Sequence, residues 1–141
     1  MKKITLLLLV VILLTACQPA ATPQSTPVPV ETLASSINDL VGVWWFTQSN
    51  LKIEFKTDGT YRVFYGSGNQ TETADAGTYT FDAGKVTWAS NVGCVDKPAT
   101  HEVYVTKQDG KSILLRLKVV GSDPCSDRAN SSNGVARFQN P

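Results

Sequence analysis

Short runs of alternating apolar and polar residues, separated by turn residues, fill the C-terminal part of the chain. In residues 51–56, for example, Leu51, Ile53 and Phe55 share one face of a strand, and charged side chains occupy the other face. Eight such runs recur about every ten residues, a spacing that is typical of β-sandwiches and β-barrels. No long stretch has helical periodicity, so we expect one all-β domain over residues 39–141.

The connections between the expected strands alternate in length. Short turns with Asp or Gly join the second strand to the third, the fourth to the fifth and the sixth to the seventh, as at Asp109-Gly110. Long loops follow the third, fifth and seventh strands. In an up-and-down meander alternate connections lie at the same end, so we expect an eight-stranded antiparallel barrel, either filled by side chains or just wide enough for a small ligand. The expected strands are residues 42–47, 51–56, 61–65, 77–81, 85–88, 102–106, 113–119 and 134–138.

The N-terminal segment has the layout of a secretory signal peptide. Two lysines follow Met1, and a largely apolar run, with Thr5 as its one polar residue, then extends to Leu14. This run is shorter than the roughly 20 residues that a membrane-spanning helix needs. The sequence that follows, Leu14-Thr15-Ala16-Cys17, resembles the lipobox of bacterial lipoproteins.

The resemblance implies a lipid anchor on Cys17. In that family the thiol receives diacylglycerol, the signal peptide (here residues 1–16) is cleaved off, and the new amino terminus is acylated, with chains such as palmitate. Two or three acyl chains give stable membrane attachment. The protein would then lie in the cell envelope, at the outer membrane of a diderm or on the outer face of the plasma membrane of a monoderm. The alternative is a secreted protein in which Cys17 merely lies beside the cleavage site.

Residues 17–38 form the expected tether between anchor and domain. Residues 18–36 contain four prolines among small polar residues, a composition that favours an extended, stiff spacer. Cleavage would remove two lysines and leave 11 Lys and Arg against 12 Asp and Glu, a net charge of −1. We therefore expect no nucleic-acid partner, because the remaining basic residues form no cluster.

Cys94 and Cys125 lie in two of the long loops, which this topology places at the same end of the barrel. With Cys17 assigned to lipid, they form an even pair in an exported, oxidising setting, so we expect a Cys94–Cys125 disulfide. A metal site or a redox pair is the alternative, but neither a supporting His nor a CxxC spacing accompanies them.

The motif Gly42-Val43-Trp44 before the first strand, together with eight strands and a late arginine, resembles the lipocalin or calycin architecture. This resemblance implies that Gly42 is structural and that Trp44 packs at the closed end of the barrel against a basic residue. Arg137 matches that residue best, and Arg128 is the weaker candidate.

A second resemblance is to small lipocalin-like domains of exported bacterial lipoproteins. It lies in the strings DGTYR (58–62) and GTYTF (77–81), the Gly93-Cys94 loop, and Asp-Pro-Cys (123–125) followed by Arg128. Because the role of those domains is generally undefined, the resemblance implies a fold rather than an activity.

The sequence gives little support for catalysis, and we expect neither an enzyme nor a cofactor. Its single histidine, His101, lacks a well-spaced acidic partner, since adjacent Glu102 should face the other way. No nucleophile elbow, zinc motif or phosphate-binding loop is present. Asp96, Asp123 and Asp127 could gather near the disulfide and bind a cation, but calcium sites need more oxygen ligands in a defined loop, so no metal is expected.

The remaining candidates are large side chains on the inward face of the strands. They would line a pocket for a small hydrophobic ligand at the envelope, or else form a filled core. In the second case the domain would be a protein-binding module, such as an inhibitor or an envelope assembly factor. We expect a monomer in either case. The candidate ligand-binding residues are Trp44, Phe55, Tyr61, Tyr79, Trp88, Val103 and Leu115.

The anchor hypothesis predicts the outcome of one substitution. In a Cys17→Ser variant the acyl chains have no attachment point, so the protein is expected to leave the membrane fraction. Fractionation of host cells followed by immunoblotting measures this, and retention of the variant in the membrane fraction would contradict lipidation.

Overall fold

The computed structural model describes residues 28–66, 72–132 and 134–139. The expected signal peptide (1–16), Cys17 and the tether up to residue 27 lie outside the described residues. Neither helical segment within those ranges is long and apolar enough to cross a bilayer.

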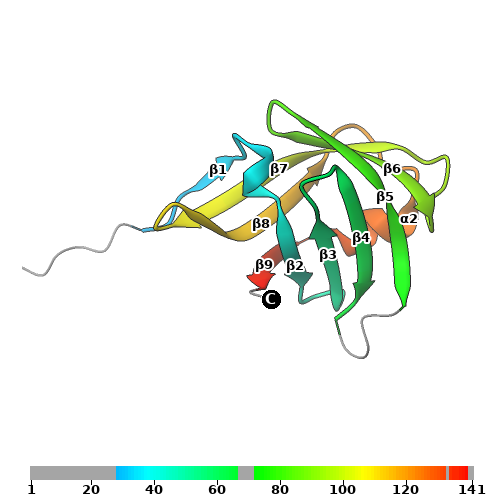
Figure 1. Ribbon diagram of the computed structural model, residues 1–141, viewed down its shortest axis with the longest axis horizontal. Coiled ribbons are helices and arrows are strands. Elements are labelled where there is room, and N and C mark those ends of the chain that lie inside the picture. The colour runs from blue at the N-terminus through cyan, green and yellow to red at the C-terminus, as the bar shows by residue number, and fades with distance from the viewer. Residues whose placement is uncertain (1–27, 67–71, 133, 140–141) are drawn as a thin grey trace, which may run out of the picture.

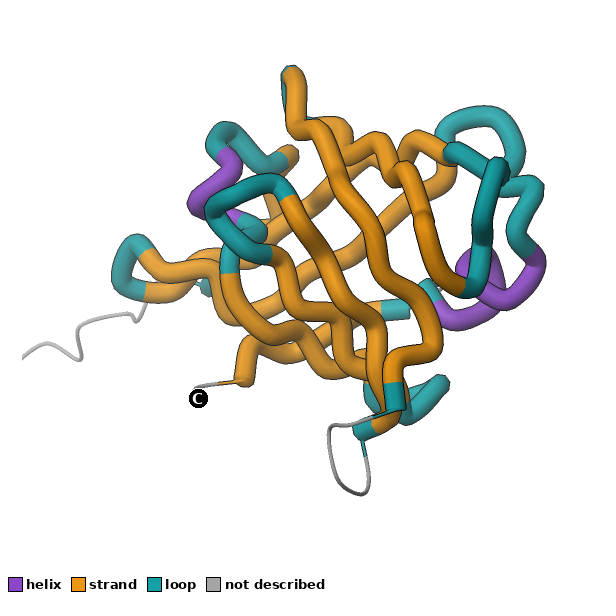
Figure 2. The backbone as a smooth tube through the Cα atoms, turned by 45° about the vertical axis from the view of Figure 1, so that its right-hand side comes forward, coloured by secondary structure: helices purple, strands orange, loops and turns teal. Residues whose placement is uncertain are grey.

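Eight of the nine strands form a closed antiparallel barrel, as expected (Figures 1 and 2). Each strand from β2 to β9 pairs with the next one along the chain, and β9 also pairs with β2, which closes the barrel. The barrel strands are β2 (Gly42–Phe46), β3 (Leu51–Phe55), β4 (Thr60–Tyr65), β5 (Thr73–Asp82), β6 (Lys85–Val92), β7 (Ala99–Gln108), β8 (Lys111–Val119) and β9 (Val135–Gln139).

Three elements were not expected from the sequence. Strand β1 (Glu31–Leu33) pairs with β7, the 3₁₀ helix η1 (Ile37–Asp39) follows it, and helix α2 (Ser126–Ser131) lies in the connection between β8 and β9. The expected tether extends to residue 38, whereas the structure pairs Glu31 with Thr106. The last part of that segment therefore belongs to the barrel domain.

The barrel has two unlike ends. At the turn end, the tight connections after β3, β5 and β7 close the strands, and Asp109 and Gly110 adopt the positive φ angles (51° and 77°) that an Asp-Gly hairpin requires. At the other end, which we call the mouth, lie the connections after β2, β6 and β8. Figure 2 shows the two helical segments at opposite ends of the barrel, with α2 at the mouth. Because β1 pairs beside the β7–β8 turn, the chain enters the domain at the turn end.

Residues before β2 plug the turn end. Leu40 is fully buried, and its carbonyl accepts a 2.6 Å hydrogen bond from the Trp44 indole Nε1. Ser36 and Asp39 form a capping box that fixes η1, and Lys107 of β7 forms a 2.6 Å ion pair with Asp39. The N-terminal segment is thus bound to the barrel by side-chain contacts as well as by pairing.

The expected packing of Arg137 against Trp44 does not occur. In the β2–β9 register Trp44 lies opposite Phe138, whereas Arg137 lies opposite Trp45. Since directly opposed residues share a face, Phe138 points inward and contacts the Trp44 ring edge-on at 5.1 Å, and Arg137 faces outward and is exposed. Arg128 lies in α2 at the mouth, so it does not take this place either.

Most of the barrel interior is filled. Trp44, Phe55, Tyr79 and Trp88 are nearly inaccessible to solvent, and Phe55 contacts both Tyr79 and Trp88 with ring centroids about 5 Å apart. Such close-packed aromatic contacts leave no space between rings. The turn end and middle of the barrel are therefore core.

Gly42 leaves the space that the Phe138 ring occupies when it packs against Trp44 in the place expected for Arg137. Its φ is +127°, and an added Cβ would lie 2.5 Å from Phe138 Cε2.

Gly42→Ala is expected to lower the free energy of unfolding by about 2–4 kcal/mol, since backbone strain and displacement of Phe138 add together. Denaturant unfolding measures this. The matched control is Gly110→Ala, where φ is +77° with nothing within 4 Å of the added Cβ, and where only about 1 kcal/mol should be lost. Equal losses in the two variants would contradict the Phe138 contact.

Candidate functional site

A cavity of about 380 Å3 opens at the mouth of the barrel. Its walls are mainly apolar side chains from β2, β3, β4 and β5, and its rim comes from the connections after β2 and β6 and from α2. The apolar wall residues are Phe46, Leu51, Ile53, Val63 and Ala74.

A β-bulge brings Asp75 into this apolar wall. The β4–β5 register shifts so that Val63 pairs with Asp75 and the next residue, Phe64, pairs with Thr73, which leaves Ala74 as the extra residue. Because Val63 faces the interior, its partner Asp75 does as well. Both Ala74 and Asp75 line the cavity, although strict alternation would place them on opposite faces.

Two hydroxyl groups converge on one oxygen of Asp75. Tyr61 Oη lies 3.0 Å from Oδ2, Ser90 Oγ lies 3.2 Å from Oδ2, and the two hydroxyls are 2.6 Å apart. The two hydroxyls supply one proton each, so two of these three contacts are hydrogen bonds at any moment. Burial raises the pKa of Tyr61 to about 12, so the phenol keeps its proton. The other carboxylate oxygen, Oδ1, is buried and has no hydrogen-bond partner among the described residues.

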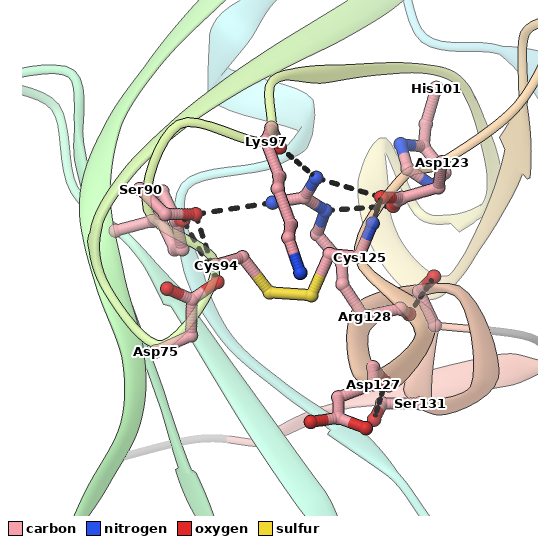
Figure 3. The surroundings of a disulfide bond; sticks show 12 residues. Asp75, Ser90, Cys94, Lys97, His101, Asp123, Cys125, Asp127, Arg128 and Ser131 are labelled. Atoms are coloured by element: carbon pink, nitrogen blue, oxygen red, sulfur yellow. Dashed lines mark hydrogen bonds and ion pairs between the residues drawn. A yellow bond between two sulfur atoms is a disulfide. The ribbon is translucent and has the colours of Figure 1, made fainter.

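Arg128 of α2 joins this group to the other side of the mouth (Figure 3). Its Nε and Nη2 donate to the two oxygens of Asp123 at 2.7 and 2.8 Å, Nη1 donates to Ser90 Oγ at 3.1 Å, and Nη2 also donates to the Lys97 carbonyl. Burial raises the pKa of Asp123, but the hydrogen bonds from Arg128 and from the Cys125 N–H outweigh burial and hold it below its usual value. The pair is therefore ionised and bidentate.

His101 is a buried, neutral member of the same network. The Trp88 indole donates to His101 Nδ1 at 3.0 Å, which places the imidazole proton on Nε2, 3.6 Å from Asp123 Oδ2. Burial lowers the pKa of His101 to about 4, against the opposing effect of the Asp123 carboxylate. The ring is thus held between Trp88 and Asp123 and does not line the mouth cavity.

The expected disulfide between Cys94 and Cys125 is confirmed and forms part of the cavity rim. It links the β6–β7 connection to the residue that precedes α2, with the two Cα atoms 5.7 Å apart. Figure 3 shows the guanidinium of Arg128 beside this bond, between Ser90 and Asp123. The disulfide and the hydrogen bond from Arg128 to the Lys97 carbonyl therefore hold the same two connections together.

The residues expected to bind ligand lie elsewhere. All seven are buried in the hydrophobic core below the mouth, and none of them lines the cavity. Each was correctly expected to face inward, but inward-facing aromatic rings pack against one another deeper in the barrel. The cavity is lined instead by residues near the strand ends at the mouth, most of them smaller than these aromatic residues.

The acidic residues considered for a cation do not converge. Asp123 is bound to Arg128, while Asp127 and Asp96 are exposed. Among the described residues, no group of three or more His, Cys, Asp and Glu side chains is placed to hold a metal ion.

Sequence reasoning missed Asp75 and Ser90 as site residues. Both lie in parts of β5 and β6 that extend beyond the expected strands 77–81 and 85–88. The only available signal was the acidic residue inside Thr73-Ala74-Asp75-Ala76, a position that offers no turn role.

Comparison of the chain with known protein families, curated proteins and solved structures found no match.

The buried imidazole predicts a specific acid sensitivity. Between pH 6.5 and about 4 the unfolded state binds a proton on His101 that the folded state does not, so stability falls as the pH falls through this window. Lowering the pH from 7.5 to 5 is expected to cost the wild type about 2 kcal/mol more than His101→Gln, which keeps an acceptor for Trp88 but does not titrate. Urea unfolding at both pH values measures this difference. Identical pH dependence in the two proteins would show that His101 is not buried in neutral form.

Proposed function

We propose that this protein is a membrane-anchored binding protein of the cell envelope that takes up a small, largely apolar molecule at the barrel mouth. The observation that carries the proposal is the cavity of about 380 Å3 with its apolar wall. Ligand pockets typically measure about 300–1,000 Å3 and combine apolar walls with a few polar groups. Asp75, Arg128 and the rim hydroxyls of Ser49 and Ser131 are among the polar groups of this cavity.

The rim of the cavity is fixed, which favours binding. The disulfide and the hydrogen bonds from Arg128 to Ser90 and to the Lys97 carbonyl restrain the two loops on one side of the mouth. On the other side, Ser49 of the β2–β3 connection donates a 3.0 Å hydrogen bond to the Ser131 carbonyl of α2. A site that is restrained before binding loses less conformational entropy when a ligand enters it.

The position of the cavity also suits an anchored protein. The chain enters the domain beside the β7–β8 turn, at the end of the barrel opposite the mouth. A lipid on Cys17 would therefore leave the mouth facing away from the membrane. The lipoprotein assignment rests on the lipobox-like sequence and on the disulfide, which persists in oxidising compartments. The proposal includes no catalytic step, because His101 is buried and engaged by Trp88 and Asp123.

A second candidate function is protein binding at the rim. Val92, Val95, Val119 and Val120, from the strand ends and loops at the mouth, are each 41–49% exposed. Exposed aliphatic side chains in one region are typical of interaction surfaces. In this case a substitution such as Val95→Asp would abolish capture of the partner, and filling the cavity would not.

Filling the cavity tests the leading proposal. Ala74→Phe places an aromatic ring in the cavity, so the affinity for the fluorescent apolar probe N-phenyl-1-naphthylamine is expected to fall at least about tenfold. Fluorescence titration measures it. Thr78→Phe is the matched control, since Thr78 is exposed on the same strand. No binding to the wild type, or equal binding by Ala74→Phe, would contradict a ligand site here.

A further inference from the structure

We propose that the ligand is an amphipathic amine, whose protonated amino group binds the free oxygen of Asp75 and whose apolar body fills the cavity. This inference rests on the proposed function and adds the chemical class of the ligand. It is carried by an unpaired carboxylate oxygen and by the charge balance around it.

The unpaired oxygen is the first observation. Asp75 is only 6% exposed, and two hydroxyl groups approach Oδ2 while Oδ1 has no hydrogen-bond partner among the described residues. A buried acceptor without a donor is costly, and the cost is higher for a charged group. Asp75 lines the cavity, and because Oδ1 itself is buried, a ligand in the cavity supplies the missing donor when the carboxylate turns toward it.

Neither the Tyr61 hydroxyl nor the Ser90 hydroxyl can donate to Oδ1 without giving up its present hydrogen bond. Tyr61 and Ser90 each have a single proton, and those protons already serve the contacts among Tyr61, Ser90 and Oδ2. The Arg128 guanidinium reaches Ser90, but it binds Asp123 with two of its nitrogens. Asp75 therefore has no direct cationic partner among the groups that contact it.

The charge balance is the second observation. Asp75 and Asp123 contribute two negative charges to the network, and Arg128 contributes one positive charge. His101 adds none, since its pKa lies near 4, and Asp127 adds a further negative charge at the cavity rim. Lys97 is exposed and gives the network only its carbonyl. An ammonium ion is thus attracted to this wall, whereas a carboxylate is repelled.

The rest of the cavity defines the body of the ligand. Phe46, Leu51, Ile53 and Val63 offer an apolar surface, and Asp75 Oδ1 is the one buried unpaired acceptor among the described side chains that line the cavity. A charged head group with an aryl or alkyl body satisfies both regions, whereas a sugar could donate a hydroxyl to Asp75 but would leave its other hydroxyl groups unpaired against the apolar wall.

Matched sets of probes test this assignment in the purified protein. The first set is 2-phenylethylamine, 2-phenylethanol and phenylacetate, and the second is tryptamine, tryptophol and indole-3-acetate. Within each set the aryl group and the number of carbon atoms are constant, and the head group is cationic, neutral or anionic. Calorimetric titration at pH 7 is expected to show the amine binding at least about tenfold more tightly than the alcohol, because its hydrogen bond is to a buried charge. The carboxylate should bind more weakly than the alcohol.

Asp75→Asn is expected to reduce the preference for the amine to less than about twofold, since it keeps the shape of the side chain but removes the charge and replaces one acceptor oxygen with an amide donor. The matched control is Asp96→Asn, which removes the same charge from an exposed residue outside the cavity. Asn tolerates the positive φ of 58° at this position. This control should keep the wild-type preference.

The outcomes separate the two proposals. Equal binding of amine and alcohol by the wild type, or a preference for the amine that survives Asp75→Asn, overturns the amine assignment and leaves the apolar site standing. Failure of every probe to bind overturns the proposed function itself. The comparison of amine with alcohol in the wild type decides the question even if Asp75→Asn does not fold.

Discussion

The architecture of the mouth depends on the buried ion pair between Arg128 and Asp123. A guanidinium is planar and has donors in fixed directions, so one side chain can bind a carboxylate in bidentate fashion and still reach Ser90 of β6 and the Lys97 carbonyl. These contacts join α2, the loop before it, β6 and the β6–β7 connection. A lysine would offer a single point of charge in the same place. Burying two charges is costly, and the complete set of hydrogen bonds offsets that cost. The Cys94–Cys125 disulfide joins the loop before α2 to the β6–β7 connection covalently. The rim is therefore held by a covalent bond as well as by the contacts of Arg128.

The two ends of the barrel differ in how tightly their side chains pack. Large aromatic rings fill the turn end and the middle, and Leu40 with η1 closes the bottom. Toward the mouth most side chains that line the interior are smaller, and the bulge at Ala74 turns Asp75 inward. A second register shift lies between Ala76 and Gly77. A Cβ added to Gly77 would lie 2.1 Å from the Ala89 carbonyl oxygen. This close approach of β5 to β6 brings Ser90 next to Tyr61 and Asp75. The packed half supplies stability, and the irregular half supplies the site.

The barrel could be predicted from the sequence because alternation and turn chemistry are local signals. The Asp-Gly turns and the alternating loop lengths followed from them. The pairing of Cys94 with Cys125 followed from the resulting topology together with the expected assignment of Cys17 to lipid. The site could not be predicted in the same way. The start of β5 is Thr, Ala and Asp rather than a β-branched or aromatic run, and the bulge that reorients Asp75 depends on pairing with β4. Arg137 shows the same limit, since a shift of one residue in β9 exchanges it for Phe138. Where a barrel stays empty depends on how side chains of different volume pack near the strand ends, and this packing is also a tertiary property.

The central claim is that the barrel mouth holds a small molecule in the host cell. Native mass spectrometry of the protein purified from its host tests this claim most directly, with denaturing spectra of the same sample as reference. We expect a small-molecule adduct that is present in the native spectrum and lost on denaturation, which distinguishes it from covalently attached lipid. The Ala74→Phe protein prepared in the same way should lack it. A wild-type protein free of any adduct, or an adduct carried equally by the filled variant, would contradict a ligand site at the mouth.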